Sequence, residues 1–191
     1  MRSAHGFSVI ELLVGMILLG ALMAIGIPGF TDYLRNARVR TTAESVLNGL
    51  QLARAEAVRR NTTARFQLVT SLDNNCALNV AGPNWVVSVD NAAGLCATAP
   101  SDAVPPRIVQ IRSGAEGSSA TTIAAGRAEV AFNSLGRVPA GNVNIDVSSA
   151  TGAACAANGG PVRCLRMVVS PGGQIRLCDP ALRPGDAQAC T

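Results

Sequence analysis

The sequence contains no lysine, so its 16 basic residues are all arginine, and its aromatic residues are limited to one Trp, one Tyr and four Phe. The missing lysine fits the codon bias of a GC-rich genome and does not by itself indicate an anionic partner. The net charge of +4 is likewise too small to predict a polyanion-binding protein. So few aromatic rings leave little surface for stacking against nucleic-acid bases.

The motifs of common catalytic and metal sites are also absent. There is no Gly-x-Ser-x-Gly elbow, no glycine-rich phosphate loop, no His-Glu-x-x-His and no Cys-x-x-Cys. Acidic residues such as Asp73 and Asp90 show no spacing that separates them from solvated loop charges. The only histidine is His5, so the rest of the chain cannot build a Ser-His-Asp or Cys-His site. We therefore predict no enzymatic activity, no cofactor and no metal site.

An apolar run occupies residues 7–27 and contains one acidic residue, Glu11, and no basic residue. As a helix it would span roughly 31 Å, which is the thickness of the hydrocarbon core of a bilayer. A carboxylate in such a segment costs about 2–3 kcal/mol or more, which makes Glu11 a candidate functional residue. If the chain were cut after Gly6, the new amino group of Phe7 would lie one helical turn from Glu11.

The run Gly6-Phe7-Ser8-Val9-Ile10-Glu11-Leu12-Leu13-Val14 resembles the class III signal of type IV pilins and type II secretion pseudopilins. The resemblance implies that prepilin peptidase removes residues 1–6, which include His5, and that the new N-terminus at Phe7 is methylated. Pro28 falls where the family often has a helix-kinking proline. An ordinary secretory signal would instead require a small-x-small cleavage site after the run, and the carboxylate inside the run argues against it.

For Glu11 we predict a role in assembly. Its carboxylate and the methylated amine of Phe7 in a neighbouring subunit are both costly to leave unpaired in an apolar environment, so pairing them across subunits removes both penalties. Residues 7–27 would then form the filament core. The alternative is that Glu11 pairs only with the N-terminus of its own chain.

The remaining pattern predicts an α+β fold. The helix is expected to cover residues 7–60, with 7–27 in the membrane, and to end near Asn61-Thr62-Thr63; Gly26, Pro28 and Gly29 are weak points. Its second half carries an apolar stripe for packing against a sheet: Val39, Ala43, Val46, Leu50, Ala53 and Ala57. Residues 61–191 form a β-rich periplasmic domain, with alternating strands at 65–70, 85–89, 107–112, 129–132, 143–147, 164–170 and 174–178. Pro171-Gly172-Gly173 predicts a hairpin between the last two strands, and 113–122 is expected to be a loop.

The cysteines indicate export. All six follow the apolar run, and an even set in an exported domain predicts disulfides in an oxidising periplasm: Cys76, Cys96, Cys155, Cys164, Cys178 and Cys190. Of the fifteen pairings that six cysteines allow, sequential pairing closes the shortest loops and is the one we predict, with free buried thiols as the alternative. Arg2 and His5 before the run favour a cytoplasmic N-terminus, although Arg35, Arg38 and Arg40 after it weaken that inference. We expect a single-pass inner-membrane protein that later enters a pilus, near its tip.

Downstream segments narrow the resemblance to the GspH/FimT/FimU group of minor pilins. They are Ala131-Phe132-Asn133-Ser134-Leu135-Gly136-Arg137 and the stretch Arg166-Met167-Val168-Val169-Ser170-Pro171. The resemblance implies a minor pilin of a type IV pilus that primes or caps the filament tip. Its partners would be prepilin peptidase, other minor pilins, the major pilin and the inner-membrane assembly platform. The alternative is a GspH-type pseudopilin of a type II secretion system, which would assemble with other pseudopilins.

A third hypothesis is DNA uptake. FimT-type minor pilins carry Gly-Arg-x-Arg near the C-terminus, whereas this chain has Gly173-Gln174-Ile175-Arg176, with the first arginine replaced. Arg176 would need further cations on the same face to hold a phosphate backbone, and the candidates are Arg163, Arg166 and Arg183.

Overall fold

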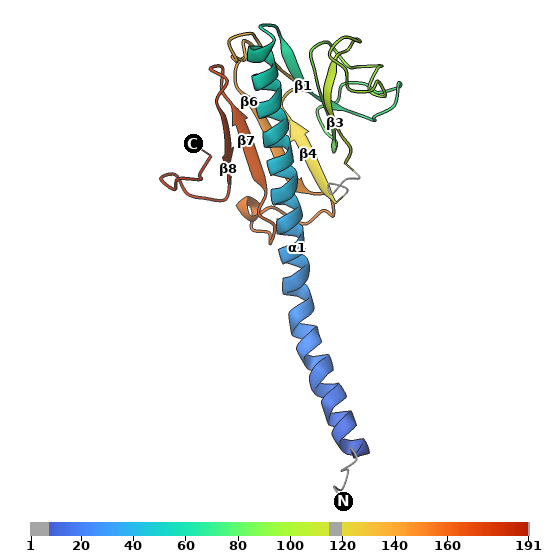
Figure 1. The fold of residues 1–191 in the computed structure, drawn as a ribbon. Helices are drawn as coiled ribbons and strands as arrows, with labels where there is room; N and C mark the ends of the chain where they lie inside the picture. The colour runs from blue at the N-terminus through green and yellow to red at the C-terminus, as the bar shows by residue number, and fades with distance from the viewer. Residues whose placement is uncertain (1–7, 115–119, 191) are drawn as a thin grey trace, which may run out of the picture. The chain divides into compact units, whose positions relative to one another are not determined.

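The computed structural model describes residues 8–114 and 120–190, and for residues 24–28 it describes the backbone alone. Among these residues, one long helix is followed by eight short strands, and one 3-10 turn lies between the sixth and seventh strands (Figure 1). The chain forms two compact units, Met1–Leu34 and Arg35–Thr191. The elements are α1 (Val9–Arg59), β1 (Ala64–Val69), β2 (Asn84–Ser88), β3 (Ile108–Arg112), β4 (Thr121–Ala125), β5 (Glu129–Phe132), β6 (Val143–Ser149), η1 (Ala156–Asn158), β7 (Leu165–Val169) and β8 (Ile175–Cys178).

The apolar stripe predicted on the second half of α1 is fully buried in the Arg35–Thr191 unit. All six of its side chains have no exposed surface: Val39, Ala43, Val46, Leu50, Ala53 and Ala57. Their spacing places them on one helical face, and this face packs against the strands. The helix ends at Arg59, and Asn61 follows with a φ of 49°, close to the predicted end.

The strands form two antiparallel sheets of four strands each. The first has the order β3-β2-β1-β5 and the second has the order β4-β6-β7-β8. Figure 1 shows the second half of α1 lying across the strands of the second sheet. The predicted strands correspond to β1–β3 and β5–β8, and the expected hairpin joins β7 to β8. The prediction missed β4: Thr121 and Thr122, assigned to a loop, begin that strand, while residues 115–119 of the expected loop lie outside the described residues.

One hydrophobic core joins α1 to both sheets. The first sheet contributes Phe66 and Trp85 to this core, and the second sheet contributes Ile145 and Met167. The apolar stripe of α1 packs with them. A smaller cluster lies around the Cys76–Cys96 bridge and includes Val69, Val86 and Ile108. The core therefore lies entirely within the Arg35–Thr191 unit.

Three disulfides close loops of the β domain, and they follow the sequential pairing predicted from loop length. Cys76 joins Cys96, Cys155 joins Cys164, and Cys178 joins Cys190. No described cysteine is left free. Each bridge restricts the unfolded chain, which stabilises the folded domain by about 2–4 kcal/mol.

Candidate functional site

The first half of α1 exposes most of its large apolar side chains. Val9, Leu22 and Met23 are 78%, 70% and 55% exposed, and the apolar residues between them are similarly open. Globular domains rarely leave a contiguous apolar surface of this kind uncovered unless another apolar surface binds it. In the part of the chain that the structure describes, no helix is both sufficiently long and sufficiently apolar to cross a membrane.

Glu11 lies in the first turn of α1 with an exposed side chain. A negative charge there interacts favourably with the N-terminal end of the helix dipole. Gly6 and Phe7, the predicted processing residues, lie outside the described residues, and so does the side chain of Pro28. Pairing of Glu11 with Phe7 stays a prediction.

Two of the four arginines predicted to bind DNA are already paired with carboxylates. Arg166 on β7 donates two hydrogen bonds to Asp146 on β6, at 2.7 and 3.1 Å, and this pairing raises the pKa of Arg166. Arg163 binds Asp179, a carboxylate only 2% exposed, at 2.9 Å. Their positive charge is therefore largely compensated within the domain.

The other two arginines lie in different parts of the domain. Arg176 on β8 is paired in register with Val168, which places it on the same sheet face as Arg166 two residues away on β7. Arg183 is exposed in the loop closed by Cys178 and Cys190. The structure thus brings Arg166 and Arg176 onto one face, while Arg163 and Arg183 lie outside the strands.

The turn that joins β7 to β8 is packed against a second turn. Gly173 has a φ of 80°, and an added side chain there would overlap the carbonyl oxygen of Gly136 and approach Arg54 on α1. The backbone N–H of Val138 also donates to Pro171 at 2.9 Å. Gln174, which stands where the DNA-uptake motif has arginine, therefore follows a turn whose position is fixed by backbone contacts.

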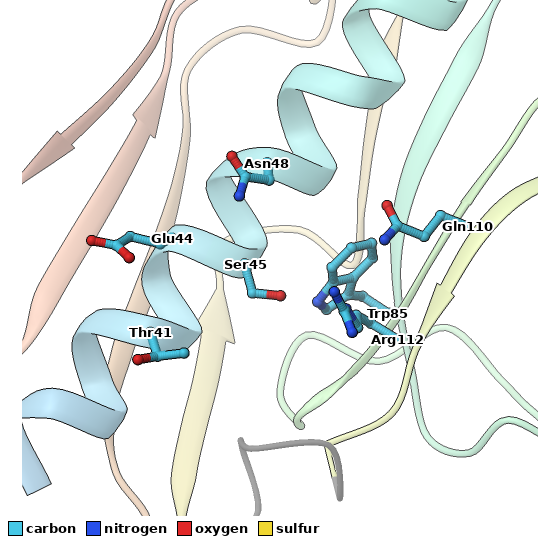
Figure 2. A pocket seen from close by; sticks show the side chains of 7 residues that line it. All are labelled: Thr41, Glu44, Ser45, Asn48, Trp85, Gln110 and Arg112. Carbon is cyan, nitrogen blue, oxygen red and sulfur yellow. The ribbon is translucent and has the colours of Figure 1, made fainter. Parts of the chain in front are cut away.

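A groove that sequence reasoning missed runs between α1 and the β2–β3 pair (Figure 2). It has a volume of about 240 Å³ and is lined by Thr41, Glu44, Ser45, Asn48, Trp85, Gln110 and Arg112. Trp85 is 3% exposed, and its ring centroid lies 5.2 Å from that of Phe66. The one signal available in the sequence was that Trp85 is the only tryptophan in the chain.

The described residues contain no group of three or more His, Cys, Asp or Glu side chains placed to hold a metal ion. The polar clusters within the domain are ion pairs and hydrogen bonds between its own elements. Glu56, for example, accepts hydrogen bonds from Arg59 and Arg60 at the end of α1.

A long N-terminal helix whose second half packs against antiparallel sheets, with disulfides in the β domain, defines the type IV pilin-like class of fold. The minor pilin FimU of Pseudomonas aeruginosa, in one crystal form, superposes with a TM-score of 0.53 at 16% identity, covering 81% of this chain and 98% of that chain. A second crystal form of FimU gives a TM-score of 0.48 at 17% identity, covering 77% and 98%.

The sequence identifies the family within this class. Residues 42–173 match the model of the family described as type II transport protein GspH, and the chain belongs to that family. The matched segment lies within the Arg35–Thr191 unit and runs from the stripe of α1 to the β7–β8 turn. No curated protein sequence matches the chain.

Proposed function

We propose that this chain is a minor pilin of a type IV pilus that helps to prime or cap the filament tip. The observation that carries the proposal is the uncovered apolar half of α1, which bears Glu11 near its start and precedes a domain with the fold of the minor pilin FimU. Such a helix requires an apolar environment both before and after assembly. We propose that prepilin peptidase removes residues 1–6 and that residues 7–27 first anchor the chain in the inner membrane.

Assembly would exchange lipid for the helices of neighbouring subunits. The apolar side chains can pack equally well against lipid or helix, so hydrophobic burial alone does not fix the position of one subunit along the next. A charged group in that environment does, because it must find its partner. We propose that Glu11 pairs with the methylated amine of Phe7 in the adjacent subunit and so sets the axial stagger.

The second candidate is a GspH-type pseudopilin of a type II secretion system. The family match supports it, because the family is described as a type II transport protein. The same helix and the same pairing of Glu11 would serve, but the short filament would act in protein export.

DNA uptake is supported less well. A phosphate backbone is held by several uncompensated cations on one face. Here Asp146 and Asp179 compensate Arg166 and Arg163, so two of the four predicted arginines are already paired within the domain.

Deletion of the gene in its host separates the three candidates. The deletion strain is scored in parallel for surface pili with twitching motility, for secreted proteins and for DNA uptake, with plasmid complementation as the control. Loss of pili with intact secretion supports the minor pilin. Loss of secretion with normal pili supports the pseudopilin, and loss of DNA uptake with pili present supports the DNA-binding role. A strain normal in all three assays would contradict the proposal.

The role of Glu11 is tested by Glu11→Gln, which removes the charge and keeps the shape. We expect processing to continue and incorporation into sheared filaments to fall by about tenfold or more, because the partner amine is left unpaired. The matched control is Asp186→Asn, which removes an exposed carboxylate from the C-terminal loop. Normal incorporation of the Glu11→Gln variant would contradict pairing of Glu11 with Phe7.

A further inference from the structure

The dipeptide Asn-Gly occurs twice in the chain, at Asn48-Gly49 and at Asn158-Gly159. In this dipeptide the glycine has no Cβ atom, so its backbone nitrogen has easy access to the side-chain amide of the asparagine before it. Attack by that nitrogen closes a five-membered succinimide ring and releases ammonia, which is the first step of asparagine deamidation. Both asparagines are exposed, so side-chain exposure does not separate the two sites. The backbone of the following glycine does.

At Asn48 the attacking nitrogen is held inside α1. The repeating hydrogen bond of an α-helix directs the N–H of Gly49 at the carbonyl oxygen of Ser45. Gly49 is also buried, and a Cβ atom added there would lie 2.8 Å from Trp85 and 2.9 Å from Phe66. Turning this peptide toward the Asn48 amide would break the helix and press it against both rings. We therefore expect the fold to protect Asn48.

At Asn158 the same nitrogen lies in a short, exposed turn. η1 ends at Asn158, and Gly159 follows in the left-handed conformation with a φ of 78°. The N–H of Gly159 donates to Ala156 at 3.0 Å, which is a bond within a single turn. Gly159 is exposed, and a Cβ atom added there would have no neighbour within 4 Å. This peptide can therefore rotate without displacing a packed side chain, and exposed turns of this kind open at a low cost in free energy.

The surroundings of the turn also permit the reaction. The side-chain amide of Asn158 makes no hydrogen bond with any residue that the structure describes. The ends of the loop are held by the Cys155–Cys164 disulfide and by a backbone bridge between Cys155 and Val162. Opening of the turn is thus confined to this loop and does not require the β domain to unfold.

We propose that Asn158 is a site of spontaneous deamidation in the folded protein and that Asn48 is not. The backbone nitrogen of Gly159 loses its proton to solvent and bonds to Cγ of Asn158. The bond from Cγ to the amide nitrogen breaks, and that nitrogen takes up a proton and leaves as ammonia. Solvent water then opens the succinimide at either of its two carbonyl carbons, which gives isoaspartate or aspartate at position 158.

The reaction gives the protein a second charge form. Each event adds one negative charge, which lowers the formal net charge of +4 by one. Isoaspartate also lengthens the backbone of the Cys155–Cys164 loop by one methylene group. The inference does not rest on the proposed function, because the reaction needs only the folded chain and water.

Peptide mapping of the full chain in detergent tests the proposal. The purified protein is incubated in mildly alkaline water labelled with heavy oxygen, so that each opening of a succinimide leaves the label in the peptide. We expect labelled isoaspartate and aspartate at position 158, and at least about tenfold less label at position 48. Equal labelling at the two positions, or no label at position 158, would overturn the proposal. Labelled aspartate without isoaspartate would do so as well, because direct hydrolysis gives that product without a ring.

Unfolding the chain separates the effect of the fold from that of the dipeptide. In denaturant with a reductant, both glycine nitrogens lose their backbone hydrogen bonds, and we expect positions 48 and 158 to be labelled at similar rates. A difference that persisted in the unfolded chain would assign the contrast to neighbouring residues in the sequence and would contradict protection by α1.

A variant of the asparagine tests the source of the acidic form. Asn158→Gln keeps the charge and the backbone but lengthens the side chain, so the five-membered ring cannot close. We expect the acidic form that accumulates in the wild-type protein to be lost from isoelectric focusing. The matched control is Asn74→Gln, which alters an exposed asparagine that no glycine follows and should leave the acidic form unchanged. An undiminished acidic form in Asn158→Gln would overturn the proposal.

Discussion

Gly49 lies where α1 comes closest to the aromatic pair of the first sheet. A Cβ atom added there would lie 2.8 Å from Cη2 of Trp85 and 2.9 Å from Cε2 of Phe66. Both rings are buried and packed against each other, so neither can move aside at low cost. The absence of a side chain therefore sets the distance between the helix and the floor of the groove.

We predict that Gly49→Ala destabilises the protein. Alanine favours helix by up to about 1 kcal/mol, but overpacking against two fixed rings costs about 1–3 kcal/mol, so the clash decides the sign. We expect a loss of about 1–2 kcal/mol, measured as a lower Tm of the full chain in detergent. The control is Gln51→Ala, an exposed position on the same helix, which should be close to neutral. A stabilised Gly49→Ala variant would show that the rings can yield.

Glu56 connects the end of α1 to its basic neighbours, and its contribution depends on pH. Hydrogen bonding from Arg59, with a further bond from Arg60, lowers the pKa of Glu56 below its ordinary 4.5. Because the folded-state pKa is the lower one, the stabilisation is present above about pH 4.5 and is lost as the pH falls through the folded-state pKa. Asp90, whose pKa is lowered by Arg107, acts in the same direction below 3.8.

Replacement of the Glu56 carboxylate should therefore lower the free energy of unfolding more at neutral pH than in acid. We predict that Glu56→Gln costs about 1–2 kcal/mol at pH 7, because charge-assisted hydrogen bonds are lost, and that the difference from wild type shrinks by pH 3. Denaturant unfolding at a series of pH values measures both. Glu44→Gln breaks an exposed pair with Arg40 and should cost about 0.5 kcal/mol or less. A pH-independent cost of Glu56→Gln would assign its role to packing instead.

At the scale of elements, most of the helix and strand predictions came from local periodicity. The stripe of α1 was readable because a period near 3.6 over five turns has no competing interpretation. β4 was missed because its first two residues, Thr121 and Thr122, belong to the low-complexity stretch that was assigned to a loop, and the three residues that remain are too few to show alternation. On one side β4 pairs with β6. On the other, the backbone N–H of Gly82 donates to Ile123, and that of Ala125 donates to Val80. Alternation within a strand also carries no information about strand order, so the split into two sheets was not predictable.

The β7–β8 hairpin offers a test in which two adjacent glycines should behave differently. Gly173 combines a φ of 80° with a close approach to Gly136, whereas Gly172 has only the Ser170 Oγ within reach, at 3.8 Å from an added Cβ. We predict that Gly173→Ala costs about 2–4 kcal/mol, since the turn must both strain and move. Gly172→Ala should cost less than about 1 kcal/mol. Thermal unfolding measures both, and equal effects would mean that the close approach is relieved without cost.

At the scale of the whole molecule, stability and assembly are assigned to different parts of the chain. Both hydrophobic clusters, all three disulfides and the GspH match lie after Leu34. Most of the exposed large apolar side chains, and Glu11, lie before it. This division could be predicted from the sequence, because a long apolar run and six later cysteines are local signals. The groove could not be foreseen, since α1, β2 and β3 bring its residues together only in the folded domain.

This separation predicts that residues 35–191 fold without the first unit. The first buried stripe residue is Val39, so a chain starting at Arg35 keeps both hydrophobic clusters. We expect the fragment to be soluble after export to an oxidising compartment, to form all three disulfides and to unfold cooperatively. Circular dichroism and thiol titration measure this, with the full chain in detergent as the control. A fragment that aggregates or keeps free thiols would show that residues before Arg35 contribute to the stability of the β domain. A fragment that folds but fails to enter filaments would place the requirement for assembly in the first unit.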